Sequence, residues 1–284
     1  MIRRRMQGHG LGLSVVEWGS EGAPLVVLLH GFQDAAESFD DVAAPLVQRG
    51  FRVVAPDLRG FGDSDRVPPG GYYYFPDYVF DVAEILDALS PHAPVRLVGH
   101  SMGGTVATLV AGTFPDRIAA LALIEGVGPP SVPGDFAVER MAAWIEGVRK
   151  QRGRPEKSLS MEEAVSRLRI SHPNLPVSTV ARRTAQLTRL GDDGRYVWAF
   201  DPLHRTRSPL EFQVERWRTF ARRITARTLC IGGGPTGFHP DDEAERIAVI
   251  PGARSVEIDG AGHMIHWTAP ATLATTLADF FGRD

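Results

Sequence analysis

Ser101 is the residue of this sequence whose neighbours point most clearly to chemistry. It lies at the centre of Gly99-His100-Ser101-Met102-Gly103, a Gly-x-Ser-x-Gly pattern that follows an apolar run and precedes a helical stretch. A serine on such a tight turn is held at the end of a strand, and the amino end of the helix favours negative charge beside it. The pattern alone is only a hypothesis, but its position between a strand and a helix predicts a nucleophile.

A serine hydroxyl needs a base within hydrogen-bond reach, because it is a poor nucleophile near neutral pH. His263 follows the last predicted strand, in the segment from Gly260 to Met264, so its loop opens at the same edge of the sheet as the serine. We expect it to be the base. Other histidines fit other roles: we expect His100 to point away from the nucleophile and His266 to pack with Trp267.

The negative charge that develops when a hydroxyl attacks a carbonyl needs N–H donors already in place. The backbone N–H of Met102, the residue after the serine, is one candidate. The other is the N–H of Phe32, in the turn His30-Gly31-Phe32-Gln33 that follows an apolar run. The plain alternative is that this turn is no more than the exit from a strand.

The segments that carry these residues alternate between strand and helix patterns. The continuous apolar run Leu25 to Leu29 is typical of a strand buried on both faces, Val95 to Val98 is a further predicted strand, and residues 39–47 repeat apolar positions at helical spacing. This alternation predicts an α/β fold in which helices wrap a mostly parallel sheet. Ligands bind at the carboxyl edge of such sheets.

The alternation stops between residues 127 and 223. We expect helices there, at 135–150, 161–170, 177–190 and 210–222, and no buried strand. The predicted organisation is a core of residues 1–126 and 224–284, interrupted by a helical cap of residues 127–223. The cap has 18 Lys and Arg against 11 Asp and Glu, in a chain of net charge −3. This excess could attract anionic substrates, or the Arg-rich helices could simply face solvent and the acidic core.

Length and composition exclude several classes of protein. A chain of 284 residues that is 43% hydrophobic can bury a large core, and it is neither disordered nor repetitive. Its single cysteine, Cys230, cannot form an intramolecular disulfide, and no Cys/His cluster has zinc-ligand spacing. No apolar run reaches about 18 residues, and no nucleic-acid motif is present. We expect a cytoplasmic protein that uses no metal or cofactor and binds neither membrane nor nucleic acid, with its oligomeric state, monomer or homodimer, left open.

Four motifs, in this order, resemble those of the α/β-hydrolase superfamily: LLHGFQD, PDLRGFGDSD, VGHSMGG and GAGH. The resemblance covers nearly the whole chain except the cap. It implies an α/β-hydrolase fold, with a doubly wound, mostly parallel sheet of about eight strands and the helical cap inserted after strand six. It also implies a Ser–acid–His triad without metal or cofactor, and acyl transfer to water through an acyl-enzyme.

The triad acid is where this sequence departs from that family. Members usually carry the acid in a Gly-x-x-Asp loop after strand seven, but here that loop, residues 231–240, has no carboxylate at the expected place. Some members carry it after strand six, where this chain has Glu125. We therefore expect Glu125 to complete the triad with the serine and the histidine. Asp241 and Asp242 are fallbacks that look like carboxylates at a helix start, and Glu125 could instead neutralise an arginine.

The nucleophile narrows the reaction. Haloalkane dehalogenases and epoxide hydrolases resemble this fold but have an aspartate as nucleophile on the turn, or elbow, where this chain has Ser101. The serine therefore argues against both reactions. We expect a serine hydrolase that cleaves a small-molecule carboxylic ester with an apolar acyl or aryl group. The alternatives are hydrolysis of a thioester, amide, lactone or C–C bond, haloperoxidase-like or lyase activity, and a non-catalytic binding protein.

Residues that could line a substrate pocket come from the core loops and the cap. They are Gln33, Trp144, Trp198, Phe200 and Met264. Aromatic residues on cap segments pack against their neighbours more often than they contact a ligand, so packing is the alternative role for the three cap residues.

Overall fold

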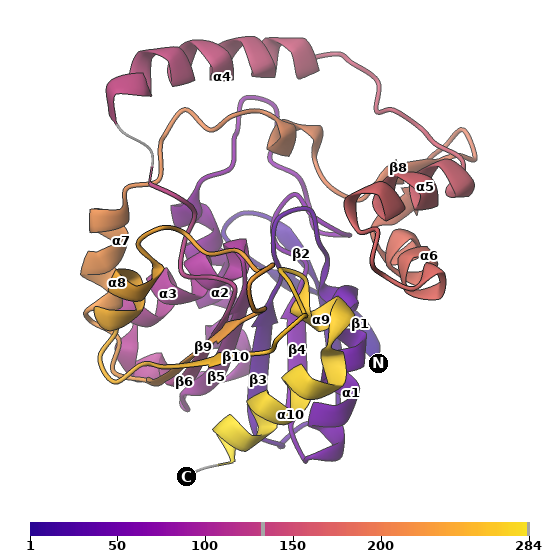
Figure 1. Cartoon of the computed structure of the whole chain (residues 1–284). Helices are drawn as coiled ribbons and strands as arrows, with labels where there is room; N and C mark the ends of the chain where they lie inside the picture. The colour runs from indigo at the N-terminus through magenta and orange to yellow at the C-terminus, as the bar shows by residue number, and fades with distance from the viewer. Residues whose placement is uncertain (132–133, 283–284) are drawn as a thin grey trace.

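An eight-stranded sheet forms the centre of the computed structural model, which describes residues 1–131 and 134–282 (Figure 1). The strands are β1 (Ile2–Gln7), β2 (Gly12–Trp18), β3 (Leu25–Leu29), β4 (Arg52–Pro56), β5 (Val95–His100), β6 (Ile118–Ile124), β9 (Arg227–Gly232) and β10 (Arg254–Glu257). Their order is β1-β2-β4-β3-β5-β6-β9-β10. Within this sheet only the β1–β2 and β2–β4 pairs are antiparallel, which confirms the predicted fold class.

Helices cover both faces of the sheet. One face packs against the 3-10 turn η1 (Ala36–Phe39), α1 (Asp40–Gln48), α9 (Ile265–Thr268) and α10 (Pro270–Phe281). The other packs against α2 (Phe75–Leu89), α3 (Met102–Thr113), α7 (Val214–Ala221) and α8 (Glu243–Ala248), and the turn η2 (Pro115–Arg117) leads into β6. Because the central strands are buried on both sides, their continuous apolar sequence follows from the fold.

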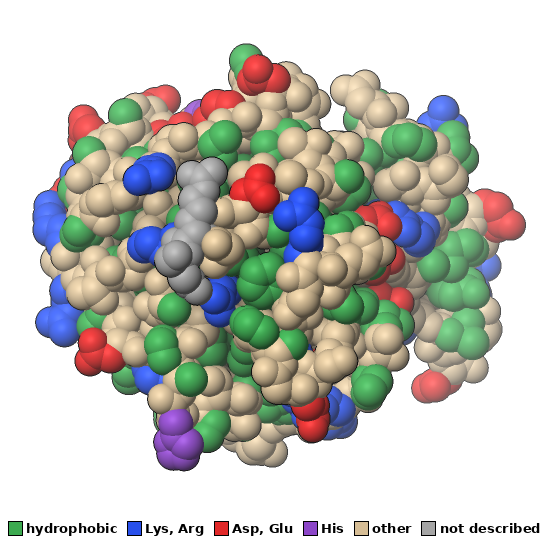
Figure 2. Space-filling model, turned by 90° about the horizontal axis from the view of Figure 1, so that it is seen from below, with side chains coloured by type: hydrophobic (Ala, Val, Ile, Leu, Met, Phe, Trp, Pro, Cys, Tyr) green, Lys and Arg blue, Asp and Glu red, His purple; other side chains and the backbone are tan. Residues whose placement is uncertain are grey.

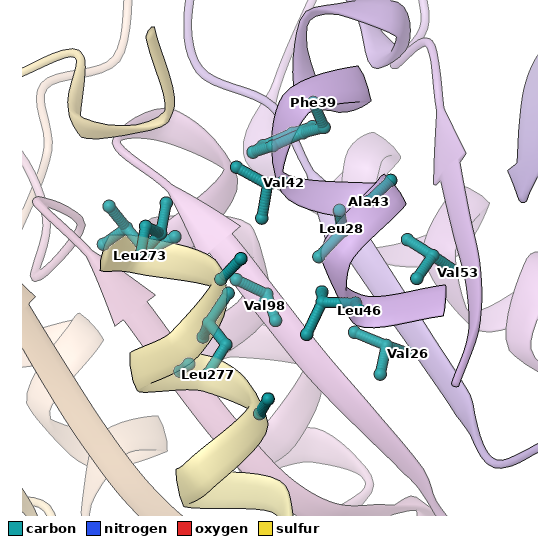
Figure 3. Close-up of a cluster of buried hydrophobic side chains, with 14 of the residues drawn as sticks. Val26, Leu28, Phe39, Val42, Ala43, Leu46, Val53, Val98, Leu273 and Leu277 are labelled. Carbon is teal, nitrogen blue, oxygen red and sulfur yellow. The ribbon is translucent and has the colours of Figure 1, made fainter. Parts of the chain in front are cut away.

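Side chains of η1, α1, α10 and the central strands interdigitate on the first face (Figure 3). Phe39, Leu46, Leu28 and Leu277 are each fully buried there. On α1 and α10 the apolar residues recur at helical spacing, so they line the side of each helix that meets the strands. This packing fixes the carboxyl ends of β3 and β5, from which the candidate site is built.

The cap lies beyond the carboxyl ends of the parallel strands, with α4 farthest from the sheet (Figure 1). Its elements are η3 (Gly134–Phe136), α4 (Ala137–Gln151), α5 (Met161–Ser171), α6 (Val177–Gln186), β7 (Thr188–Leu190), β8 (Tyr196–Trp198) and η4 (Pro202–Arg205). The helix α7 also falls within residues 127–223, but it packs against α3, and its Trp217 is 1% exposed within the core cluster. The predicted boundaries of the cap remain a proposal.

Two details of the cap differ from the prediction. The helix expected at 177–190 ends at Gln186, and β7 then pairs antiparallel with β8 in a small second sheet. A turn at residues 191–194 reverses the chain, with Gly194 at φ 72°, and the Gly-Asp-Asp-Gly sequence of this turn favours a hairpin. The helix expected at 210–222 begins only at Val214.

Charged side chains of both signs are interspersed on the face opposite α4 (Figure 2). Part of the cap's positive charge is neutralised by the core, because Arg182 and Arg183 of α6 pair with Asp40 and Asp41 of α1.

Among the described residues, no helix has the length and apolar character needed to cross a membrane.

Candidate active site

Ser101 occupies a strained turn between β5 and α3. Its backbone has φ 51° and ψ −116°, a conformation that L-residues other than glycine rarely adopt. Gly99 and Gly103 make the turn possible, because a side chain on Gly99 would collide with the backbone of Gly103, and one on Gly103 with the backbone of Leu29. The flanking glycines of the sequence pattern are therefore explained by close contact between strand and helix.

A chain of hydrogen bonds runs from this serine to a buried carboxylate. The Ser101 Oγ lies 3.0 Å from Nε2 of His263, and Nδ1 of the same ring lies 3.2 Å from Oε2 of Glu125. A carboxylate can only accept, so Nδ1 carries the proton and Nε2 is free to accept the serine proton. The structure thus brings together the three residues predicted to form a triad, in the order that base catalysis needs.

Glu125 follows β6, and its side chain is only 1% exposed. Its Oε1 accepts a hydrogen bond from the backbone N–H of Gly233 at 2.5 Å, and its Oε2 accepts one from the N–H of Phe238. Both donors belong to the loop after β9, where the expected acid is missing. The loop after β9 therefore donates hydrogen bonds to the carboxylate of Glu125, which follows the neighbouring strand β6.

The fallback carboxylates have other partners or none near the histidine. Asp242 pairs with Arg246 at 2.7 Å and with Arg218 at 3.2 Å. Asp241 is exposed at the start of α8. Neither aspartate bonds to His263 within the part of the chain that is described.

Two backbone N–H groups are available beside the nucleophile. Met102 is the first residue of α3, where helical N–H groups have no partner within the helix. Phe32 lies in the loop after β3, and this loop approaches the nucleophile so closely that a methyl group on Gly31 would lie 3.2 Å from Cβ of Ser101. Within the described residues, neither N–H donates to another group.

The five predicted pocket residues lie in different environments. Gln33 is exposed, with φ 59°, and Met264 is half-buried beside His263. Trp144 packs edge-on against Tyr72, with ring centroids 5.6 Å apart. Trp198 and Phe200 belong to packed clusters, and Phe200 is 7% exposed. The structure shows packing contacts for all three cap residues, and their contact with a substrate stays a prediction.

Other aromatic residues near the site were not anticipated from the sequence. The ring of Phe238 lies 5.6 Å from that of His263. The ring of His204 in η4 stacks on that of Phe61, with centroids 4.1 Å apart, and the ring of Phe32 lies 5.9 Å from that of His204. Burial lowers the pKa of His204 to about 3, so the ring is neutral and packs as an aromatic group. No periodic pattern marks such loop residues.

Asp34, His100 and His266 are described side chains whose ligand atoms lie close enough together to hold a metal ion. One ligand atom from each lies within 4.8 Å of the others, and all three are buried. Sequence spacing could not reveal this group, because its members lie on three separate segments. Two of these side chains already bond to each other, since Nε2 of His266 lies 2.8 Å from Oδ2 of Asp34. As expected, the His266 ring also packs on Trp267, 5.7 Å away.

Comparisons with known proteins agree with this fold. Residues 24–270 match the family described as alpha/beta hydrolase fold. A serine hydrolase-like protein of Danio rerio is 28% identical over 275 residues, which cover 93% of this chain and 83% of that protein. The sn-1-specific diacylglycerol lipase ABHD11 of Mus musculus is also 28% identical over 275 residues, covering 92% and 82%. Among solved structures, the thioesterase domain from the curacin biosynthetic pathway has a TM-score of 0.84 at 27% identity, with 98% of both chains covered. The chain therefore belongs to the α/β-hydrolase fold family.

Proposed function

We propose that this protein is a serine hydrolase that cleaves carboxylic esters through an acyl-enzyme. The observation that carries the proposal is the hydrogen-bond chain from Ser101 through His263 to Glu125, built on a strained elbow. Strain of this kind persists where the surrounding structure holds it, and it is common at active sites. Relatives over most of the chain are named as a serine hydrolase-like protein and a lipase.

In the proposed mechanism, Oγ of Ser101 attacks the ester carbonyl while Nε2 of His263 takes the hydroxyl proton. The tetrahedral oxyanion accepts hydrogen bonds from the N–H groups of Phe32 and Met102. Collapse of this intermediate breaks the ester C–O bond, and the imidazolium returns the proton to the leaving alcohol. Water then attacks the acyl-enzyme by the same route and releases the acid and the free serine.

Glu125 acts on the histidine in this mechanism. It accepts a hydrogen bond from Nδ1–H and so fixes the tautomer in which Nε2 can accept a proton. It also stabilises the imidazolium formed during attack. The cap, residues 127–223, would limit the size of the acyl or aryl group, and the apolar side chains of Phe32, Phe238 and Met264 beside the triad favour an apolar one.

Thioester hydrolysis is a second candidate. It is favoured by the match to a thioesterase domain along almost the whole length of both chains. The same nucleophile, base and oxyanion donors serve both reactions, because only the leaving atom changes from oxygen to sulfur.

The test combines a covalent probe with turnover. A fluorophosphonate should label the wild-type protein at Ser101, located by mass spectrometry of peptides, and should not label Ser101→Ala. Esters of p-nitrophenol with increasing acyl length, and the matching acyl thioesters, then give the preferred bond and chain length as kcat/KM. A folded wild-type protein that is neither labelled nor active on any of them would instead indicate a binding protein.

A further inference from the structure

Three polar side chains are buried behind the candidate triad. Asp34, His100 and His266 are each no more than 2% exposed. Asp34 lies in the loop that carries Phe32, His100 precedes Ser101, and His266 lies in α9 just after the base. The group therefore has one member on the segment of Phe32, one on that of Ser101 and one on that of His263, although the proposed mechanism uses none of the three side chains.

The bond between Asp34 and His266 joins two of these segments. Oδ2 of Asp34 lies 2.8 Å from Nε2 of His266, and Oδ1 accepts the N–H of Ala35 at 2.9 Å. The carboxylate can only accept, so His266 carries its proton on Nε2. This bond spans 232 positions of the sequence, and it ties the loop of the proposed oxyanion donor Phe32 to the helix that follows the base.

His100 makes a second connection. Its Nε2 lies 2.9 Å from the backbone carbonyl oxygen of His263, and a carbonyl also only accepts, so this nitrogen carries the proton. The His100 ring is 4.5 Å from that of His266 and 4.9 Å from that of His263. The residue beside the nucleophile thus holds the backbone of the base.

The charge states fit a fixed scaffold. Burial lowers the pKa of His100 and also that of His266, where the bond to Asp34 opposes the effect. In each ring Nδ1 has no partner, so each is neutral with one N–H. Burial opposes ionisation of Asp34, but the hydrogen bond from His266 holds its pKa below the usual range. Around neutral pH, Asp34 is therefore an anion that accepts hydrogen bonds, and His100 and His266 are neutral rings that each donate one N–H.

We propose that Asp34, His100 and His266 are positioning residues that set the Phe32 N–H and the His263 ring against Ser101. The inference rests on the proposed serine hydrolase function. Catalysis by an oxyanion donor and a base depends on their placement, and a displacement of about 1 Å can cost about 100-fold in rate. A hydrogen bond that joins the loop of Phe32 directly to α9 is suited to prevent such a displacement, since it holds the two segments to each other.

The test uses pairs of variants that differ in one donor. The amide nitrogen of glutamine can reach the position of Nε2, so His266→Gln keeps the bond to Asp34, whereas His266→Leu removes it at similar size. His100→Gln and His100→Leu form the same pair for the bond to the His263 carbonyl. We expect each leucine variant to lose about 10- to 100-fold in kcat with KM changed less than about twofold. Each glutamine variant should stay within about threefold of the wild type.

Thermal melting and circular dichroism separate this outcome from loss of the fold. A leucine variant that melts at a lower temperature but, when folded, has the wild-type kcat would overturn the proposal, because the bond would then only stabilise the protein. If a leucine variant does not fold, Asp34→Asn decides, since it keeps the side-chain shape but has only one oxygen for the two N–H donors. Wild-type kcat in folded Asp34→Asn would equally reject the proposal.

The rate of fluorophosphonate labelling provides a readout that needs no ester substrate. It depends on the same base and the same oxyanion donors, so it should fall in the leucine variants in parallel with kcat. If the wild type is not labelled at all, the proposed function fails. If the wild type is labelled and all variants are labelled at its rate, the function stands and this inference alone fails.

Discussion

Glu125 and Gly233 meet where β6 and β9 end side by side, with Oε1 of the carboxylate 2.5 Å from the backbone nitrogen of the glycine. The loop after β9 lacks the expected acid, yet its N–H groups remain as donors. Any side chain on Gly237 of this loop would collide with the same carboxylate. The glycine-rich sequence that seemed to have lost a carboxylate is therefore explained by the need to surround one.

Glu125→Gln should reduce turnover by about three to four orders of magnitude, by analogy with removal of a triad carboxylate. With its oxygen bonded to Gly233, the amide places its nitrogen against Nδ1 of His263 and favours the wrong tautomer. In either orientation it can accept only one of the two N–H bonds from Gly233 and Phe238. The variant should also lose about 1–3 kcal/mol of unfolding free energy, because one buried N–H loses its partner. Measurements of kcat and of urea unfolding give the two effects separately.

The matched controls are Asp241→Asn and Asp242→Asn. Asp241 is exposed and Asp242 pairs with arginines, so neither change should alter kcat by more than about twofold. If one of these substitutions cripples the enzyme while Glu125→Gln is mild, the acid does not lie after β6.

Strain at the nucleophile predicts a difference between two inactive variants. Ser101→Ala retains a side chain at φ 51°, whereas Ser101→Gly relieves the conformation, which costs about 1–2 kcal/mol for an L-residue. Both should be inactive and unlabelled, but Ser101→Gly should be more stable than Ser101→Ala by about 1 kcal/mol. Equal urea midpoints for the two would show that the elbow is not strained.

The sequence predicted the sheet and the positions of Ser101, Glu125 and His263 because these depend on local patterns. Apolar runs mark the buried strands that precede Ser101 and Glu125, and His263 comes after the last strand of the same parallel set, so their meeting at one edge is a consequence of parallel strands. The bond distances confirm that the three side chains meet, while their catalytic roles stay predictions.

The contacts that the sequence did not predict are those between distant loops. Asp34 and His266 carry no periodic signal, and each residue alone reads as an ordinary loop or helix side chain. The β7–β8 hairpin was missed for a different reason: its strands have only three residues each, too few to show alternation. Short elements and loop-to-loop bonds are decided by tertiary packing rather than by local propensity.

His239 should make stability depend on pH. Both its ring nitrogens face acceptors, Nε2 at 2.9 Å from the Gly234 carbonyl and Nδ1 at 2.6 Å from Oε2 of Glu243. The bond to Gly234, followed by that to Glu243, raises the pKa of His239 to about 9 from the usual 6.5. Because the folded value is the higher one, the imidazolium stabilises the fold fully below about pH 6.5, and this contribution is lost as the pH rises through about 9.

The comparison for this effect is His239→Gln. Between pH 6.5 and 9, the unfolding free energy of the wild type should fall relative to that of the variant, as measured by urea titration at several pH values. Parallel curves for the two proteins would mean that His239 titrates normally.

The last prediction concerns the ion pairs that fasten α6 to α1. Arg182 and Arg183 both pair with Asp40 and Asp41, but the side chain of Arg183 is fully buried while that of Arg182 is 44% exposed. Arg183 also bonds to Gln186 and lies over the ring of Trp267.

Exposed pairs contribute about 0–1 kcal/mol because solvent screens them, whereas breaking a buried pair costs about 3–5 kcal/mol when the remaining charge is also buried. The aspartates are partly exposed, so Arg183→Met should lower the unfolding free energy by about 2 kcal/mol, and Arg182→Met by less than about 1 kcal/mol. Urea unfolding of the two variants tests this directly, and equal losses would show that burial does not decide the strength of these pairs.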